Sequence, residues 1–271
     1  MLGAIAGDIV GSIYEFDPID HEDFEPLFGE DATFTDDTIL TVAVADALVS
    51  GRDPVETFKA WGRGFPNAGW GGMFARWLFS DETAPYGSFG NGAAMRVSPA
   101  GWIGRDLDEV LALADRVTVV THDHPDAVDG ARAVAEAVYR FRTRATADAV
   151  RDAIGRRYGY DLDRTAAQIR PHYDFDETCR GTVPPALVCA LEARSTEDAI
   201  RKAVSLGGDA DTLAAIAGAV AEARFGLPTD LANEALARIP EPMRDVLRRA
   251  YARAGAAMPG GTQDADPDPA T

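Results

Sequence analysis

The sequence has little cysteine, little lysine and no long apolar segment. Two cysteines in 271 residues, Cys179 and Cys189, are too few for a disulfide framework or a four-cysteine zinc site. Residues 1–12 are apolar but lack a basic residue and contain Asp8, so we expect no signal peptide and a reduced, cytoplasmic protein. No uncharged run approaches the roughly 20 residues that a membrane-spanning helix needs.

Positive charge is also scarce. Lys and Arg together number 26, against 44 Asp and Glu, which gives a formal net charge of −18. This excess of negative charge repels phosphate backbones and anionic lipids, so we expect no general nucleic-acid binding and no membrane association. The hydrophobic fraction of 46% and the charged fraction of 26% are ordinary for a folded chain. Nothing in the composition indicates the oligomeric state.

Apolar residues recur mainly at helical spacing. Two clear stripes run through 127–138 and 243–251, each with a proline near its predicted first turn. Further helices are predicted at 55–61, 107–120, 146–154 and 196–204. The β-branched run 117–120 would also suit a strand, but it continues the helical pattern that begins near Leu107.

No alternating strand pattern stands out, so the sequence predicts an all-α protein, a compact helical bundle. Residues 1–258 are expected to form one domain, and residues 259–271, rich in Gly, Pro and Asp, a disordered tail. Two long connections are expected, an acidic one at 16–34 and one rich in glycine and aromatics at 68–92. Long connections in a compact domain are often functional.

Two segments place paired acids just before an apolar run. Thr35-Asp36-Asp37-Thr38 precedes the run 39–49, and Gly207-Gly208-Asp209-Ala210-Asp211-Thr212 precedes 213–220. Each alone has a simple explanation as a capped helix start, because Asp and Thr are favoured there. Together they supply four carboxylates and several hydroxyls, a suitable ligand shell for two hard divalent cations.

The four histidines show no zinc-binding spacing. Ligation by oxygen alone favours Mg²⁺, with Mn²⁺ or Ca²⁺ as alternatives. If the four carboxylates meet, their mutual repulsion makes bound cations close to obligatory.

Three further segments contain candidate site residues. Glu15 closes an apolar, glycine-punctuated segment predicted to be helical, and is either a surface acid or a functional one. Residues 87–96, Gly-Ser-Phe-Gly-Asn-Gly-Ala-Ala-Met-Arg, form a glycine-rich turn that either cradles a phosphate or is merely structural. Thr121-His122-Asp123-His124-Pro125 carries two histidines, one of which could orient a substrate.

This set of motifs resembles the ADP-ribosylglycohydrolase family, the DraG-like enzymes. The matching pieces, each weak alone, occur in the family's order and span most of the chain. They are Gly7-Asp8 with Gly11 and Glu15, Thr35-Asp36-Asp37-Thr38, Gly90-Asn91-Gly92-Ala93-Ala94-Met95-Arg96, Thr121-His122 with His124-Pro125, and Gly207-Gly208-Asp209-Ala210-Asp211-Thr212.

The resemblance implies an all-α orthogonal bundle with two Mg²⁺ ions (Mn²⁺ possible) in a cleft. It implies hydrolysis of the glycosidic bond between ADP-ribose and an acceptor, which is a protein side chain, a nucleobase or a small molecule, with release of ADP-ribose. By the family pattern the metal ligands are Thr35, Asp36, Asp37, Asp209, Asp211 and Thr212. The substrate-binding residues it implies are Ser88, Gly90, Asn91 and Gly92 near the diphosphate and His122 near the ADP-ribose.

The motifs leave alternatives for the proton shuttle, the adenine contact and the function itself. Glu15 is the first choice as proton shuttle, with Asp36 or Asp209 as alternatives. Tyr173 or Phe175 could stack on adenine, an assignment made from composition. Two rival functions remain, a non-catalytic ADP-ribose-binding protein of the same fold and a two-metal nucleotide phosphohydrolase. The acceptor cannot be read from the motifs.

Overall fold

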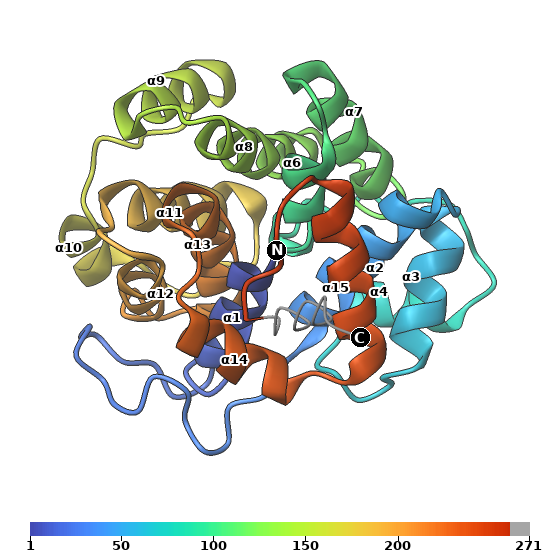
Figure 1. The fold of residues 1–271 in the computed structure, drawn as a ribbon, viewed down its shortest axis with the longest axis horizontal. Coiled ribbons are helices and arrows are strands. Elements are labelled where there is room, and N and C mark those ends of the chain that lie inside the picture. Colours follow the sequence, from blue (N-terminus) through green and yellow to red (C-terminus); the bar gives the residue numbers. More distant parts are fainter. Residues whose placement is uncertain (261–271) are drawn as a thin grey trace, which may run out of the picture.

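The computed structural model describes residues 1–260, and most of them are helical (Figure 1). No strand occurs in this part of the chain, where one isolated antiparallel bridge pairs Gly90 with Thr178. The predicted all-α fold is therefore confirmed. In chain order the helices are α1 (Leu2–Gly11), α2 (Asp36–Ser50), α3 (Pro54–Arg63), α4 (Gly72–Phe79), α5 (Gly92–Met95), α6 (Ser98–Ile103), α7 (Leu107–Thr118), α8 (Pro125–Arg142), α9 (Ala147–Tyr158), α10 (Ala166–Ile169), the 3₁₀ turn η1 (Arg170–His172), α11 (Cys179–Glu192), α12 (Thr196–Val204), α13 (Ala210–Phe225), α14 (Thr229–Arg238) and α15 (Glu241–Arg253).

The centre of the fold is the packing of α1 against α13, both of which are buried along almost their whole length (Figure 1). Glycines recur at every fourth position of α1, so one face of that helix carries no side chains. A Cβ added at Gly7 would lie 2.0 Å from the carbonyl oxygen of Ala214, and one at Gly11 would lie 2.4 Å from the Cα of Asp211. Only glycine permits this approach, which brings the end of α1 to the start of α13.

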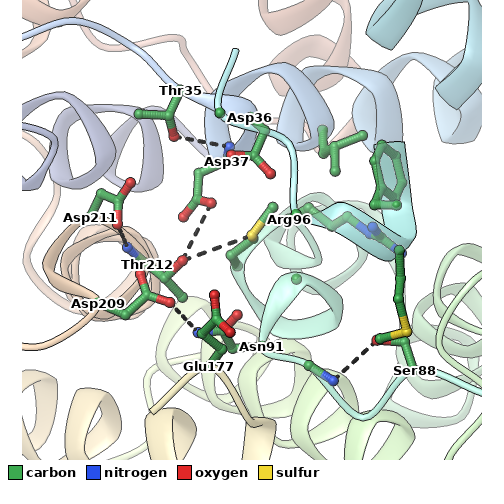
Figure 2. Close-up of a pocket in the computed structure, with 18 of the residues that line it drawn as sticks. Thr35, Asp36, Asp37, Ser88, Asn91, Arg96, Glu177, Asp209, Asp211 and Thr212 are labelled. Atoms are coloured by element: carbon green, nitrogen blue, oxygen red, sulfur yellow. Dashed lines mark hydrogen bonds between the residues drawn. The ribbon is translucent and has the colours of Figure 1, made fainter. Parts of the chain in front are cut away.

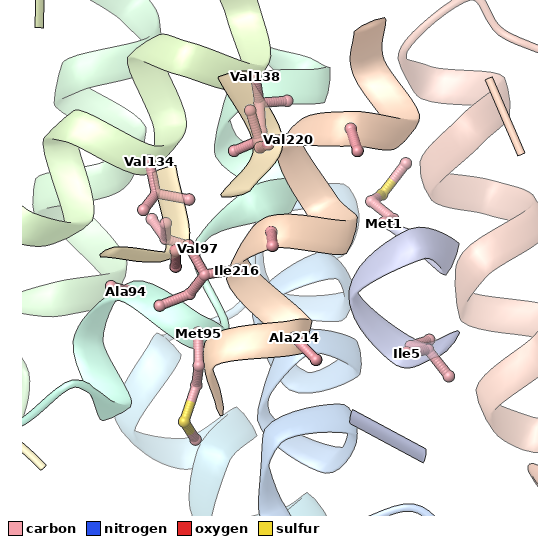
Figure 3. Close-up of a cluster of buried hydrophobic side chains, with 14 of the residues drawn as sticks. Met1, Ile5, Ala94, Met95, Val97, Val134, Val138, Ala214, Ile216 and Val220 are labelled. Carbon is pink, nitrogen blue, oxygen red and sulfur yellow. The ribbon is translucent and has the colours of Figure 1, made fainter. Parts of the chain in front are cut away.

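Apolar side chains from several helices close around this central pair. Met1 caps α1 and Ile5 lies within it, Ile216 comes from α13, and Val134 and Val138 come from α8. All five are fully buried (Figure 3). Alanines fill much of the remaining core, which lets the helices approach closely with few aromatic residues.

The helices expected from periodicity are confirmed. The predicted segments correspond to α3, α7, α8, α9, α12 and α15, and α12 has the predicted bounds. In the β-branched run 117–120, the first two residues end α7 and the last two lie in the turn after it. The strand alternative for this run is therefore wrong. None of the helices in residues 1–260 is both long enough and apolar enough to cross a bilayer.

Two expectations about connections have different outcomes. Residues 16–34 contain no helix, as expected. The connection 68–92 instead contains α4, which buries Phe74, Trp77 and Leu78 although the preceding glycines are typical of a loop. Of the predicted tail 259–271, residues 261–271 lie outside the described residues, so the single domain 1–258 with a tail stays a prediction.

Candidate functional site

One cavity of about 450 Å³ collects nearly all the residues singled out in the sequence (Figure 2). Its walls come from the α1–α2 connection, the start of α2, the glycine-rich turn before α5 and the start of α13. Tyr173 is the exception, because it lines a neighbouring cavity together with Phe175. The predicted residues that share the first cavity are Glu15, Thr35, Asp36, Asp37, Ser88, Gly90, Asn91, Gly92, His122, Asp209, Asp211 and Thr212.

The start of α2 is anchored by a buried acid of α1. Thr35 caps the helix by accepting a hydrogen bond from the Asp37 backbone N–H at 3.2 Å. The Asp8 carboxylate accepts from the Thr35 N–H at 3.0 Å, from its hydroxyl at 2.7 Å, and from both the N–H and the hydroxyl of Thr38. Asp36 and Asp37 follow directly in the first turn, where the helix dipole favours negative charge.

The start of α13 follows two positions whose backbone conformation favours glycine. Gly207 and Gly208 have φ values of +74° and +66°, a left-handed conformation that side chains disfavour. They turn the chain so that Asp209 stands at the N-cap of α13 and Asp211 in its first turn. The Asn91 side-chain amide donates to Asp209 Oδ2 at 2.6 Å and to Thr182 Oγ1 at 3.1 Å, which ties α13 to the glycine-rich turn and to α11.

The two acidic helix starts face each other across the cavity (Figure 2). The Thr212 hydroxyl of α13 donates to Asp37 Oδ1 of α2 at 3.4 Å, joining residues 175 positions apart. The other oxygen, Asp37 Oδ2, is buried and has no hydrogen-bond partner in residues 1–260. Within the same residues no three acidic, histidine or cysteine side chains are already arranged around a metal position.

Burial and mutual repulsion raise the pKa values of these acids. For Asp37 the main cause is burial, followed by the charge of Asp211, and the pKa lies well above its usual range. The pKa values of Asp36 and Asp211 are likewise raised well above their usual range, chiefly by burial and then by the charges of Asp8 and Asp209 respectively. Burial and mutual repulsion thus favour the protonated forms of these acids in the absence of a bound cation.

Glu15 reaches the same cavity from a turn, not from a helix. The sequence placed it at the end of a helix, but α1 ends at Gly11, where the backbone already touches α13, and the chain turns before Glu15. Its side chain is half-buried, and burial, followed by the charges of Asp209 and Glu177, raises its pKa to about 7. A carboxyl with that pKa exchanges protons readily near neutral pH.

The glycine-rich turn of residues 87–92 forms another wall of the cavity. Ser88 is buried, and its hydroxyl accepts from the Gly90 backbone N–H at 3.2 Å. His122 stands behind the turn, because a Cβ at Gly92 would lie only 3.3 Å from its Nε2 atom. A Cβ at that position would be in tight contact with the imidazole ring, which would have to shift by a few tenths of an ångström.

Three further residues contribute to the site without having been predicted from the sequence. Asp8 has a signal that could have been used, since it is the one charged residue in the apolar helix α1 and a buried charge needs partners. Arg96 and Glu177 line the cavity, but nothing in the local sequence around Glu177 marks it. Its backbone carbonyl accepts from the Asn91 N–H at 2.7 Å.

The chain is similar to a known protein family and to several proteins of known sequence or structure. The model of the ADP-ribosylglycohydrolase family matches residues 1–263. The chain is 26% identical to the ADP-ribosylhydrolase ARH3 of Bos taurus, over 84% of each chain, and 24% identical to that of Danio rerio, over 84% of this chain and 82% of the relative. An uncharacterized protein of Archaeoglobus fulgidus is 30% identical over 51% of this chain and 50% of its own.

Among solved structures the chain is similar to one described as an ADP-ribosylglycohydrolase-related protein complex. The TM-score is 0.65 at 24% identity, with 95% of this chain and 97% of that chain covered. A likeness at this identity establishes a common fold.

Proposed function

Since the chain belongs to the ADP-ribosylglycohydrolase family, we propose that it is a metal-dependent hydrolase that cleaves the glycosidic bond between ADP-ribose and an acceptor, releasing ADP-ribose. The ARH3 relatives, at low identity, support a hydrolase of this type. The metal dependence and the roles of individual residues are part of the proposal.

One observation carries the proposal. The acid pairs of α2 and α13, far apart in the sequence, line the same cavity as the glycine-rich turn and His122. A cluster of hard oxygen donors thus lies beside a turn suited to a diphosphate, and this combination suits an ADP-ribosyl substrate bound with metal ions.

The residues present fit two Mg²⁺ ions, with Mn²⁺ as the alternative. The donors are all oxygens, Asp37 Oδ2 is buried without a partner, and burial together with neighbouring acids raises the pKa of Asp37 and Asp211. Ions at this position supply electrostatic stabilisation and a more acidic water molecule. We assign their binding to Thr35, Asp36, Asp37, Asp209, Asp211 and Thr212.

The protein's own contribution to bond cleavage is orientation and proton transfer. Breaking a glycosidic bond passes through an oxocarbenium-like state and needs a group that can take up and give back a proton. Glu15 is suited to this because its pKa, raised by burial and by Asp209 and Glu177, is about 7. Asp36 and Asp209 are the alternatives if Glu15 proves dispensable.

The wall of the cavity formed by the glycine-rich turn and His122 would hold the substrate. We assign the diphosphate to Ser88 and the backbone of 90–92, and part of the ADP-ribose to His122. Composition suggested that adenine stacks on Tyr173 or Phe175. Both residues line the neighbouring cavity, so the geometry does not favour this stacking.

Analysis of the products tests this function. The protein is incubated with ADP-ribosyl substrates linked through arginine, serine, a nucleobase and an acetyl ester, with Mg²⁺ or with EDTA. We expect free ADP-ribose from at least one linkage and only when the metal is present. Release of phosphate or a nucleoside monophosphate would identify a phosphohydrolase instead, and binding of ADP-ribose with no cleavage of any linkage would identify a non-catalytic binding protein.

A further inference from the structure

A fully buried arginine lies at the wall of the cavity. Arg96 is 0% exposed, and its guanidinium lies over the ring of Phe58 at 4.9 Å. Its Nε and Nη1 atoms are shielded from solvent and have no hydrogen-bond partner in residues 1–260. The side chain is connected to its surroundings by hydrogen bonds through its third nitrogen, Nη2.

The third guanidinium nitrogen connects Arg96 to a threonine and a histidine. Arg96 Nη2 donates to Thr121 Oγ1 at 2.7 Å, and that oxygen lies 2.8 Å from His122 Nδ1. A guanidinium only donates, so the threonine oxygen accepts and its own proton needs another acceptor. Thr121 is fully buried, and two groups beside its hydroxyl can accept that proton, His122 Nδ1 at 2.8 Å and the Tyr86 hydroxyl. We assign the proton to the contact with Nδ1.

A proton on Nδ1 would be poorly accommodated. That nitrogen faces the Thr121 hydroxyl and, at 3.4 Å, Arg96 Nη2, which can only donate. An imidazolium is disfavoured as well, because burial, and then the charge of Arg96, lowers the pKa of His122 well below its ordinary value. The ring therefore carries one proton, and that proton belongs on Nε2.

The other ring nitrogen of His122, Nε2, lies next to the glycine-rich turn. A Cβ built on Gly92 or Gly90 would lie 3.3 Å or 3.7 Å from it, and His122 lines the cavity. In residues 1–260 the hydrogen bonds of this ring involve Nδ1 alone. The Nε2–H donor is thus available at the glycine-rich turn.

We propose that Arg96 is a positioning residue: acting through Thr121, it holds neutral His122 in the tautomer that carries its proton on Nε2 and presents that N–H to an oxygen of the bound ligand. The proposal rests on the proposed function only for the identity of the ligand, which is ADP-ribose.

Nitrogen-15 NMR of the imidazole rings tests the tautomer without any activity measurement. The chain has four histidines, and the His122 signals are assigned by their loss in His122→Gln. We expect the Nδ1 resonance of an unprotonated nitrogen and the Nε2 resonance of a protonated one at pH 7. A protonated Nδ1 in the wild-type protein would overturn the proposal, whether or not the protein hydrolyses ADP-ribosyl bonds.

Variants test the connection. Thr121→Val keeps the shape but removes the hydroxyl, so we expect a mixture of tautomers and a three- to tenfold weaker affinity for ADP-ribose, on the order of one hydrogen bond. Thr121→Ser restores the hydroxyl and should restore both. In hydrolysis assays KM should change more than kcat, because the donor acts on binding.

A second pair of variants tests the role of Arg96. Arg96→Met removes the donor, so Thr121 can accept from Nδ1 and the tautomer should shift, whereas Arg96→Lys keeps a donor and should retain it. If Arg96→Met does not fold, the Thr121 pair still decides. An unchanged tautomer in Thr121→Val would overturn the proposal. The expected tautomers in the wild type and in the variants, combined with no binding of ADP-ribose by the wild type, would count against the proposed function alone.

Discussion

The carboxylate of Asp8 accepts hydrogen bonds from both the backbone N–H and the hydroxyl of Thr35, at 3.0 and 2.7 Å. Asp8 lies in the middle of α1 and is completely buried, whereas Thr35 caps α2. This contact fixes the start of α2, and with it Asp36 and Asp37, to the helix that also packs against α13. Asp8 therefore supports the acidic cluster from behind.

Replacing Asp8 by Asn should damage both stability and the site. One acceptor oxygen becomes an NH₂ donor facing the N–H and hydroxyl donors of Thr35 and Thr38, and an unsatisfied buried group of this kind costs about 1–3 kcal/mol. We expect a free energy of unfolding lower by that amount in urea titrations and weaker Mg²⁺ binding by calorimetry. Asp17→Asn, the same change at an exposed position, is the control. Equal stability of Asp8→Asn and wild type would show that the contact is not needed.

Asp211→Asn should separate metal binding from folding. The Asn side-chain oxygen can still accept from the Thr212 N–H, as Asp211 Oδ1 does at 2.9 Å, so the local structure is kept. Without one of the repelling charges the metal-free variant should melt at a higher temperature than the wild type, yet bind Mg²⁺ weakly and lose nearly all turnover. Cleavage of ADP-ribosyl substrates at the wild-type rate in EDTA would contradict the assignment of Asp211 as a ligand.

Glu15→Gln should reduce the chemical step. The amide cannot carry a proton to or from the reaction, and loss of a general acid–base group lowers rates by about 10²- to 10⁴-fold. We expect kcat to fall while the affinities for Mg²⁺ and ADP-ribose, measured by calorimetry, stay close to those of the wild type. Glu30→Gln at an exposed position is the matched control. If kcat is unchanged in Glu15→Gln, the proton shuttle has to be sought at Asp36 or Asp209.

The stability of the metal-free protein should fall as the pH rises. Burial, followed by neighbouring acids, raises the pKa of Glu15 to about 7 and the pKa values of Asp36, Asp37 and Asp211 well above their usual range. The folded chain thus holds protons that the unfolded chain releases near pH 4, and this stabilising contribution is lost as the pH rises through the folded-state values.

Thermal denaturation in EDTA at pH 5.5 and pH 8 measures this effect. We expect a Tm lower by about 3–10 °C at pH 8, on the scale of one to a few kcal/mol for a chain of this size. Added Mg²⁺ should restore Tm mainly at pH 8, where the ligands are ionised. A Tm in EDTA that rises between these pH values would show that the acid cluster does not dominate the titration.

The sequence by itself determined the all-α class, the helices with strong periodicity and the motifs that carry the family resemblance. Local rules suffice for these, because helical spacing and N-cap preferences act within a few residues. The same rules missed α4, whose glycines are typical of a loop, and extended the first helix to Glu15 because they contain no information about α13.

Only the tertiary structure decided which residues meet. Thr212 reaches Asp37, 175 positions away, because the glycines of α1 allow α13 to approach until backbones touch. Tyr173 lines a different cavity from the glycine-rich turn, and Arg96, 26 positions before His122, donates a hydrogen bond to the neighbouring Thr121. Contacts between distant segments depend on how whole helices pack, and that packing is set by the sum of many side chains and not by any single motif.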